Sequence, residues 1–414
     1  MIPRRILLAD CDAMFVAVAR LVDPDGAGKA RLLVVGGRAN SRGVVCSASW
    51  EARAFGLRAG MPISRAARLC PDAMFVPVPG KECGVKHREI RAVLDEWVPA
   101  VEPASIDEFY LDLSGTEAVY RGEPLAETAR RLRADVRERT GMTLSIGGGT
   151  NRLVAKLAAE RAKPRPGTGA TGVLIVPPGG EAEFLAEHAL ADIPGVGPRL
   201  QATLGRYGLT RVKDALRVDA PTFEQWLGPR SGRWLFERIR GRSGDSVSPD
   251  EANRSMSHEE TFSRDITSDE ALETRLLRLV TSLTAEIRSE GISTGCITVK
   301  LRDSDFKTRQ ASRTLPKPLR TDRALYTVAR DLLVSLRAKR RTAARLLGVS
   351  FSALSAGEGT PQLTLLPDVA REAETPRDRQ LASAVDNINT KLGGKAIGPA
   401  SLMKGKEPRP PQIR

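Results

Sequence analysis

The first 178 residues alternate between strand-like and helix-like patterns of hydrophobic positions. Short apolar runs at 4–10 and 143–149 have the length and composition of buried strands. Apolar positions recur at helical spacing within 87–98 and 150–164. Interleaved strands and helices of this kind predict a globular domain of the α/β or α+β class.

The strand signal disappears between residues 180 and 240. Helical patterns there flank the turn sequence "IPGVGPRL" at 193–200, and residues 241–255 are rich in Gly, Ser, Pro and Asp. Because Pro and Gly interrupt regular structure, we predict a helical region followed by a linker.

A second series of periodic segments follows the linker. It predicts a strand, a helix, two strands, a helix and a strand, at 258–266, 268–291, 295–305, 306–315, 322–340 and 346–354. This β-α-β-β-α-β order is typical of a compact split-βαβ unit. Beyond residue 356 the chain is rich in Pro, Gly and charged residues, and we expect a flexible tail.

The charge of the chain indicates the class of partner. Its 414 residues include 64 Lys and Arg against 50 Asp and Glu, a formal net charge of +14. Nucleic acid is the first partner to consider for such a basic chain. No apolar run reaches the roughly 18 residues of a membrane span. Five cysteines without C-x-x-C spacing and three distant histidines argue against a zinc site, so we expect a cytoplasmic protein with reduced thiols.

Two adjacent carboxylates, Asp107 and Glu108, lie inside the apolar stretch "AVEPASIDEFYLDLSG" at 100–115. Like charges beside a core repel each other and lose hydration. A tight hairpin turn near Ser105 would let both side chains converge on Mg²⁺, which prefers oxygen ligands. Asp10, at the end of the first strand, supplies a third carboxylate for a two-metal phosphoryl-transfer site. The alternative is that Asp107 and Glu108 are turn residues and that Asp10 caps a helix.

Five stretches then identify a resemblance. "LLADCDAMFVAV", "SASWEARAFGLRAGMP", "SIDEFYLDLSG", "SIGGGTNRLVAKLAAERAKPRP" and "IPGVGPRLQATL" occur in this order. Together they resemble a Y-family, lesion-bypass DNA polymerase, most similar to the bacterial DNA polymerase IV branch.

The resemblance implies an α+β multidomain fold shaped like a right hand. Its expected parts are a ferredoxin-like palm (1–13 and 77–178), small fingers (14–76), a helix-hairpin-helix thumb (179–240), a linker (241–255), a β-α-β-β-α-β little finger (256–356) and a tail (357–414).

The resemblance also implies roles for single residues at the catalytic centre. Asp10, Asp107 and Glu108 would bind two Mg²⁺ ions, for which Mn²⁺ can substitute, together with the backbone carbonyl of Cys11. Phe15 matches the steric gate that excludes a ribose 2′-hydroxyl; without the family context it would be an ordinary core residue.

Four further positions match the site of the incoming dNTP triphosphate, and one lysine lies nearby. They are Ser47, Trp50, Arg53 and Lys163, with Lys156 as the nearby helix lysine. Cations there would offset phosphate charge, whereas a lone Arg or Lys is more often a solvated surface group. Three positions depart from the family pattern. Trp50 replaces the usual phosphate-contacting Tyr, Met14 replaces a common aromatic residue, and Ala19 replaces a usual acidic residue. The family pattern therefore does not define the shape of this nucleotide pocket.

Two segments are candidates for contact with primer-template DNA. In the helix-hairpin-helix sequence, Gly195 and Gly197 would let backbone N–H groups approach a phosphate, with Arg199 nearby; the alternative is a plain Pro-Gly turn. In the strand pair, Lys300 and Arg302 lie on one face by period two, and Lys307, Arg309 and Arg313 share a face of the next strand. A basic face with few acids would follow phosphates, where the alternative is a solvated polar face.

The tail sequence Gln362, Leu363, Thr364, Leu365, Leu366 is similar to the peptide by which bacterial polymerases bind the sliding clamp (β subunit). Apolar anchors in an extended peptide can fill a pocket, although such short motifs also occur by chance. The helical pattern that follows has no derivable role.

We therefore expect a monomeric, template-directed DNA polymerase of low fidelity, with no exonuclease domain for proofreading. Two other functions are compatible with parts of the sequence: a palm-fold nucleotidyl cyclase, and a non-catalytic DNA- and clamp-binding accessory protein. The DNA-binding segments argue against the first, and the three retained carboxylates argue against the second.

Overall fold

A computed structural model of the whole chain describes residues 3–165, 167–244, 246–249, 253–356, 374–393 and 396–403. The chain divides into two compact units, Met1–Glu251 and Ala252–Arg414, with a boundary inside the expected linker. Among the described residues, no helix combines the length and the apolar character that crossing a membrane requires.

A five-stranded sheet forms the centre of the first unit. Its strands lie in the order β5 (Ala100–Pro103), β6 (Glu108–Asp112), β1 (Ile6–Cys11), β7 (Leu144–Gly149) and β8 (Val173–Ile175). Only β7 and β8 pair in parallel. Helix α4 (Gly80–Trp97) connects β1 to β5 along the chain, and α5 (Leu125–Thr140) connects β6 to β7. The strand order β5-β6-β1-β7 with these two helices is that of a ferredoxin-like fold, to which β8 is added.

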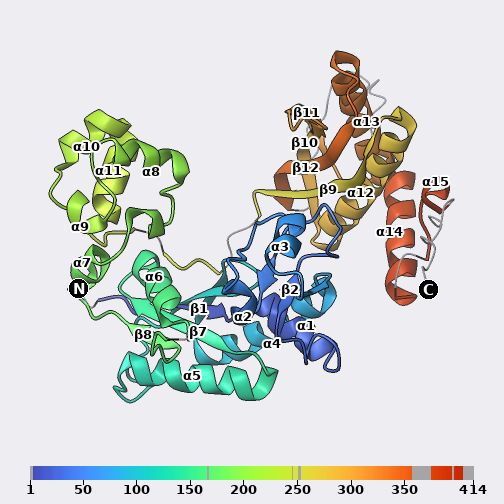
Figure 1. Cartoon of the computed structure of the whole chain (residues 1–414). Coiled ribbons are helices and arrows are strands. Elements are labelled where there is room, and N and C mark those ends of the chain that lie inside the picture. The colour runs from blue at the N-terminus through green and yellow to red at the C-terminus, as the bar shows by residue number, and fades with distance from the viewer. Residues whose placement is uncertain are drawn as a thin grey trace. The chain divides into compact units, whose positions relative to one another are not determined.

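The two faces of this sheet bury different residues of β1. Leu7 and Ala9 belong to a core with α4 and α5, whereas Ile6 and Leu8 pack on α6 (Arg152–Ala162) on the opposite face. Figure 1 shows α5 and α6 on opposite sides of the sheet. Because side chains alternate along a strand, Asp10 lies on the same face as Ile6 and Leu8, toward α6.

Helix α6 approaches β7 so closely that there is no room for a side chain at Gly147. A Cβ on Gly147 would lie 1.9 Å from the backbone nitrogen of Ala159 and 2.3 Å from the carbonyl oxygen of Ala155. The sequence "SIGGG" in β7 and the alanines of α6 therefore form a backbone-to-backbone contact.

A small three-stranded sheet belongs to the same unit. Its order is β3 (Ser47–Ala48), β2 (Leu33–Val35), β4 (Met74–Val76), with helices α1 (Met14–Val22), α2 (Trp50–Arg53) and α3 (Ile63–Leu69). Strand β3 is only two residues long, and β4 ends directly before Pro77 and Pro79.

The segment after β8 is helical, as predicted. It contains α7 (Glu181–Ala186), the 3-10 turn η1 (Leu190–Asp192), α8 (Pro198–Gly205), α9 (Val212–Ala215), α10 (Ala220–Leu227) and α11 (Pro229–Arg238). These short helices share a core around Phe223 and Leu235.

The second unit contains a four-stranded antiparallel sheet. Its elements are β9 (Ser255–Ile266), α12 (Asp269–Ser289), β10 (Ile292–Asp303), β11 (Thr308–Leu319), α13 (Asp322–Lys339) and β12 (Ala344–Ala356), in the strand order β11-β10-β12-β9. One strand separates the two strands of each βαβ crossover, so the predicted split-βαβ unit is confirmed. Both helices pack on one face of this sheet.

The predicted flexible tail is wrong for residues 374–393. Helix α14 (Pro376–Lys391) folds onto the second unit, where Asp386 binds Arg288 at 2.6 Å and Asp378 binds Arg323 at 2.7 Å. A short helix α15 (Ala400–Met403) follows. The interface of α14 is polar and α14 buries no residue fully, which is why hydrophobicity did not reveal that it docks.

The contact at Gly147 yields a prediction. Gly147→Ala should lower the free energy of unfolding of the first unit by about 3 kcal/mol, because the new methyl group would overlap the backbone of α6. Thermal and denaturant unfolding of the full chain measure this. In the control Gly84→Ala on α4, the nearest atom lies 3.7 Å away, so stability should hold or rise. Equal stability of Gly147→Ala and wild type would contradict the close contact.

Candidate active site

The site begins with two carboxylates that face each other across neighbouring strands. Asp10 of β1 and Glu108 of β6 are direct partners in the antiparallel register. The Cys11 N–H donates a hydrogen bond of 2.8 Å to the carbonyl of Asp107. All three carboxylate residues therefore lie at the same end of two central strands, nearly a hundred residues apart in sequence.

Ser105 organises the hairpin turn that carries Asp107. Its hydroxyl donates to the Asp107 carboxylate and accepts from the backbone N–H groups of Asp107 (3.3 Å) and Glu108 (3.1 Å). His87 Nδ1 lies 2.9 Å from the carbonyl of Ile106. The hairpin turn predicted near Ser105 is confirmed, whereas the hydrogen bonds by which Ser105 holds it were not predicted.

Two lysines of the α6 region neutralise the carboxylates. Lys156 Nζ lies 2.7 Å from both carboxylate oxygens of Glu108, and Lys163 Nζ lies 2.9 Å from Asp10. Within the described ranges, His, Cys, Asp and Glu side chains nowhere gather in threes as metal ligands. The structure thus brings the three residues to one sheet edge, while their side chains point to Lys163, Ser105 and Lys156.

Burial makes the negative charge of Asp10 costly. Loss of hydration raises the pKa of Asp10 to about 6; Lys163 opposes this shift, and Glu108 and Asp107 add to it. Burial also raises the pKa of the Cys11 thiol and of Asp12, to which the Ser145 hydroxyl donates at 2.6 Å. Asp10 and the nearby Asp107 and Glu108 offer carboxylate oxygens, the ligand type that a divalent cation such as Mg²⁺ prefers.

A cationic group lies on α2 beside this edge. Arg53 donates to the carbonyl of Ala48 at 2.9 Å and to the Ser47 hydroxyl at 3.4 Å. Its guanidinium lies 4.5 Å from the centre of the Trp50 ring. Burial and then the charge of Arg165 lower the pKa of Arg53. The chain therefore keeps two like charges close together next to Asp10, an arrangement that favours an anionic ligand.

Trp50 serves as a support for these arginines. The guanidinium of Arg165 lies 5.8 Å from the Trp50 ring, on which Arg53 also packs. Stacking of a guanidinium on an indole fixes its orientation. Arg165 was missed from the sequence, where the only signal is a second cation two residues after Lys163.

Phe15 lies in the first turn of α1, half-buried between two cores. The preceding Ala13 has a left-handed backbone (φ 47°), which sets the direction in which α1 leaves β1. Met14 and Ala19, two of the departures from the family pattern, are 1% and 6% exposed and belong to these cores.

The helical segment adds a polar pocket of about 700 Å³ next to Lys156. Its walls come from Tyr110, Arg152, Leu153 and Lys156, from Pro194 and Arg238, and from Gly244, Ser246 and Ser248. Gly195, Gly197 and Arg199 are exposed around the N-terminus of α8. Gly195 has a φ of +99° and Trp234 fills the place of a Cβ, so no other residue fits there.

In the second unit, the predicted face of Arg309 and Arg313 is wrong. The register pairs Lys300 with Gln310 and Arg302 with Thr308, so Arg309 and Arg313 lie on the helix-covered face. There Arg309 binds Asp303 at 2.9 Å and Arg313 binds Asp331 at 3.6 Å.

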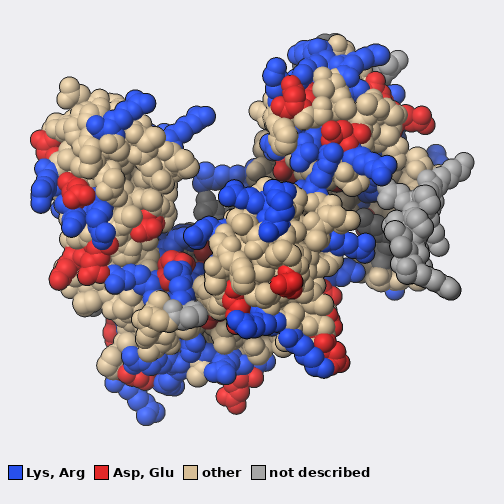
Figure 2. Space-filling view, in the orientation of Figure 1, with Lys and Arg blue, Asp and Glu red and all other residues tan. Residues whose placement is uncertain are grey.

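The opposite, open face of this sheet is rich in hydroxyl groups. Lys300 and Arg302 lie on it, but Lys300 pairs with Glu259 at 2.9 Å, so the expected near absence of acids is also wrong. Lys307 lies in the turn, 74% exposed. The hydroxyl groups on this face come from Ser255, Ser257, Thr298, Thr308, Ser312, Thr314, Ser350 and Ser352. On the visible face of both units, Lys and Arg side chains are spread among fewer Asp and Glu side chains (Figure 2).

The predicted clamp peptide, Gln362 to Leu366, lies outside the described residues.

Comparisons with known proteins agree with this arrangement of segments. The profile of the impB/mucB/samB family matches residues 9–160, and the profile of the C-terminal domain of that family matches residues 253–365. DNA polymerase IV of Caulobacter vibrioides is 33% identical over 398 residues, 96% of this chain and 94% of that protein. DNA polymerase IV of Dehalococcoides mccartyi is 31% identical over 394 residues, covering 95% and 96%.

Solved structures match over most of the chain as well. A Y-family DNA polymerase chimera of Dbh and Dpo4 superposes with a TM-score of 0.74 at 24% identity, over 85% of this chain and 100% of that chain. DinB from Sulfolobus solfataricus gives a TM-score of 0.57 at 25% identity, over 84% and 98%. Through its near full-length identity to DNA polymerase IV proteins and its two family domains, the chain belongs to the Y-family of lesion-bypass DNA polymerases.

Proposed function

We propose that this polymerase adds dNTPs to a primer 3′-hydroxyl by two-metal phosphoryl transfer, with Asp10, Asp107 and Glu108 as the metal-binding carboxylates. The observation that carries the proposal is the register pair of Asp10 and Glu108 beside the Asp107 turn. Asp10 and Glu108 lie on the face of the sheet that α6 covers, next to the cations Lys163 and Arg53.

The donor set suits Mg²⁺, with Mn²⁺ as a substitute. Asp10, Asp107, Glu108 and the carbonyl of Cys11 would hold two ions. When bound, the ions lower the pKa of the primer hydroxyl and stabilise the leaving oxygen. Lys156, which binds both oxygens of Glu108 in this structure, would share this carboxylate with a metal ion, and the low exposure of Asp10 would limit competition from water for its oxygens.

The cations beside the carboxylates would hold the triphosphate of the dNTP. Lys163 and Arg53 offset charge on the phosphates, Ser47 donates a hydrogen bond, and Trp50 orients Arg53 through ring stacking. Phe15 would lie against the sugar and exclude a 2′-hydroxyl. The half-buried position of Phe15 between two packed cores supports this role, because a fixed ring excludes an extra atom better than a mobile one.

The remaining parts would bind primer-template DNA. Residues 1–13 and 77–178 act as the ferredoxin-like palm, 14–76 as fingers, 179–240 as a helix-hairpin-helix thumb and 256–356 as the little finger. Gly195, Gly197 and Arg199 would contact a backbone phosphate, and the open face with Lys300 and Arg302 would follow the duplex through hydroxyl and cationic contacts. The proposal is of a monomeric, cytoplasmic enzyme of low fidelity that lacks proofreading.

Primer extension tests the catalytic assignment. Asp107→Ala should lower the rate of dNTP addition with Mg²⁺ by about 100-fold or more, because the metals lose a shared ligand, while DNA binding is kept. Asp95→Ala, an exposed acid on α4, is the matched control and should extend primers like wild type. Templated extension at the wild-type rate by Asp107→Ala would refute the assignment. Wild-type DNA binding without extension would instead indicate an accessory protein.

A second proposal concerns the sliding clamp. Replacing Leu363 and Leu365 together by Ala should abolish clamp pull-down, because the apolar anchors of the peptide are lost, while distributive primer extension stays nearly unchanged. Leu381→Ala on α14 removes a leucine that is 64% exposed and serves as the control. Retained pull-down by the double variant would contradict the motif.

A further inference from the structure

The turn between β10 and β11 holds an aromatic ring at an unusual place. The Asp303 N–H donates to the Lys307 carbonyl and the Phe306 N–H donates to the Asp303 carbonyl, both at 2.9 Å. Phe306 has a φ of 66°, the left-handed conformation that hairpin turns usually give to Gly or Asn. Its side chain is 64% exposed. The ring therefore occupies a strained backbone position and gains little burial within the protein.

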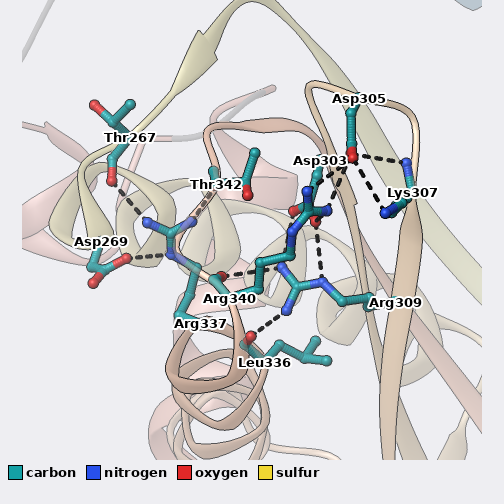
Figure 3. Close-up of polar contacts among 10 residues, drawn as sticks. All are labelled: Thr267, Asp269, Asp303, Asp305, Lys307, Arg309, Leu336, Arg337, Arg340 and Thr342. Atoms are coloured by element: carbon teal, nitrogen blue, oxygen red, sulfur yellow. Dashed lines mark hydrogen bonds and ion pairs between the residues drawn. The ribbon is translucent and has the colours of Figure 1, made fainter.

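A buried ionic network holds this turn rigidly (Figure 3). Asp303 is fully buried and accepts from Arg309 at 2.9 and 3.2 Å and from Arg340 at 2.7 Å. Arg340 also binds Asp305 at 2.8 Å, and Arg309 donates to the carbonyls of Leu336 and Arg340.

A third arginine fixes the surroundings of the turn. Arg337 donates to the carbonyls of Thr342 (2.6 Å) and Thr267 (3.0 Å) and binds Asp269. The turn is thus fastened to the end of α13 and the start of β12. Phe306 is consequently exposed on a turn that these contacts hold in place, and not on a loose loop.

The exposed ring lies among cations. The guanidinium of Arg345 lies 4.5 Å from the centre of the Phe306 ring. Lys307, the next residue, has a side chain that is 74% exposed. Its ammonium group lies 3.9 Å from the Asp305 carboxylate, which Arg340 binds more closely, at 2.8 Å. Arg302 donates to the Thr308 hydroxyl at 2.8 Å on the same hairpin. The acids of the turn are occupied by Arg309 and Arg340, so the surface around the ring is positive.

We propose that this hairpin tip, defined as Phe306, Lys307 and Arg345, is a binding site for single-stranded DNA. Phe306 would stack on an unpaired base, and Lys307 would contact a neighbouring phosphate. An aromatic ring with flanking cations binds single strands without sequence preference, because every base offers a flat face. A duplex hides these faces, which is why a ring at a protruding tip points to unpaired template. The proposal rests on the proposed function only in that DNA must reach the protein.

Fluorescence anisotropy of the full-length protein in EDTA, without dNTP, tests the site. Two DNAs are compared: a primer-template with a single-stranded 5′ template overhang of about 12 nucleotides, and the same duplex with blunt ends. Phe306→Ala should weaken binding of the overhang DNA by about 5- to 20-fold and leave the blunt duplex unchanged. Phe306→Tyr should restore binding, and Val334→Ala, which removes a 50% exposed side chain of α13, should have no effect.

Each other outcome overturns the proposal. If Phe306→Ala binds overhang DNA like wild type, the ring does not stack on DNA. If both DNAs lose affinity equally, the ring contacts duplex. If wild-type protein binds neither DNA, the proposed polymerase function fails together with this site, whereas the first two outcomes leave that function intact. A thermal unfolding midpoint of Phe306→Ala equal to that of the wild-type protein verifies that the fold is kept.

A covalent probe provides an independent measurement. Irradiation of wild-type protein with an overhang that carries 5-iodouracil should cross-link the base to the peptide that contains Phe306, as read by mass spectrometry. The same label placed inside the blunt duplex should give no such adduct. Absence of the adduct from the overhang DNA would overturn the proposal even if affinities changed.

Discussion

The catalytic region depends on one constraint: Asp10 and Glu108 face each other in the register of β1 and β6. Two carboxylates on directly paired residues of adjacent strands, in a partly buried place, repel each other and need cations to balance their charge. A shift of one residue between the strands would turn Asp10 toward α4 and abolish the pair. The alternation that buries Leu7 on one face and Leu8 on the other fixes this register, so the core determines where the catalytic charge lies.

The cations that balance this pair come from one helix. Lys156 lies within α6 and Lys163 at its C-terminal end, and α6 reaches the sheet only because Gly147 lacks a side chain. The same lysines can act in two states. In this structure they neutralise the carboxylates, and under the proposed mechanism their charge would become available to the phosphates of a bound nucleotide. The backbone contact at Gly147 therefore sets the distance between the acids and the cations on which both states depend.

Patterns within one element were predictable from the sequence, whereas relations between elements were not. Long periodic segments such as α12 and α13 followed from spacing, and the turn at Asp107 was the hypothesis that would let two adjacent carboxylates converge. The face predicted for Arg309 and Arg313 was wrong because the turn before β11 determines which of its residues point to which side of the sheet. Phe306 belongs to that turn and was taken as the first strand residue, which hid the left-handed step. Arg165 acts through the ring of Trp50, which only the fold brings near it.

The arginines of the second unit show why net charge is a poor guide to DNA contact. Arg309, Arg337 and Arg340 donate their hydrogen bonds to acids and backbone carbonyls within the unit; the acids are Asp303, Asp269 and Asp305. Lys300 is paired with Glu259. These cations stabilise the hairpin and the sheet. Only the few cations that reach a DNA phosphate would release counterions and so contribute to DNA affinity. The basic composition therefore reflects two uses of arginine. Inside the unit it fixes the position of Phe306, and at the surface it leaves a small number of cations beside a hydroxyl-rich sheet. Under the proposed function, the stiffness that the first group provides would let the second group hold DNA at a defined place.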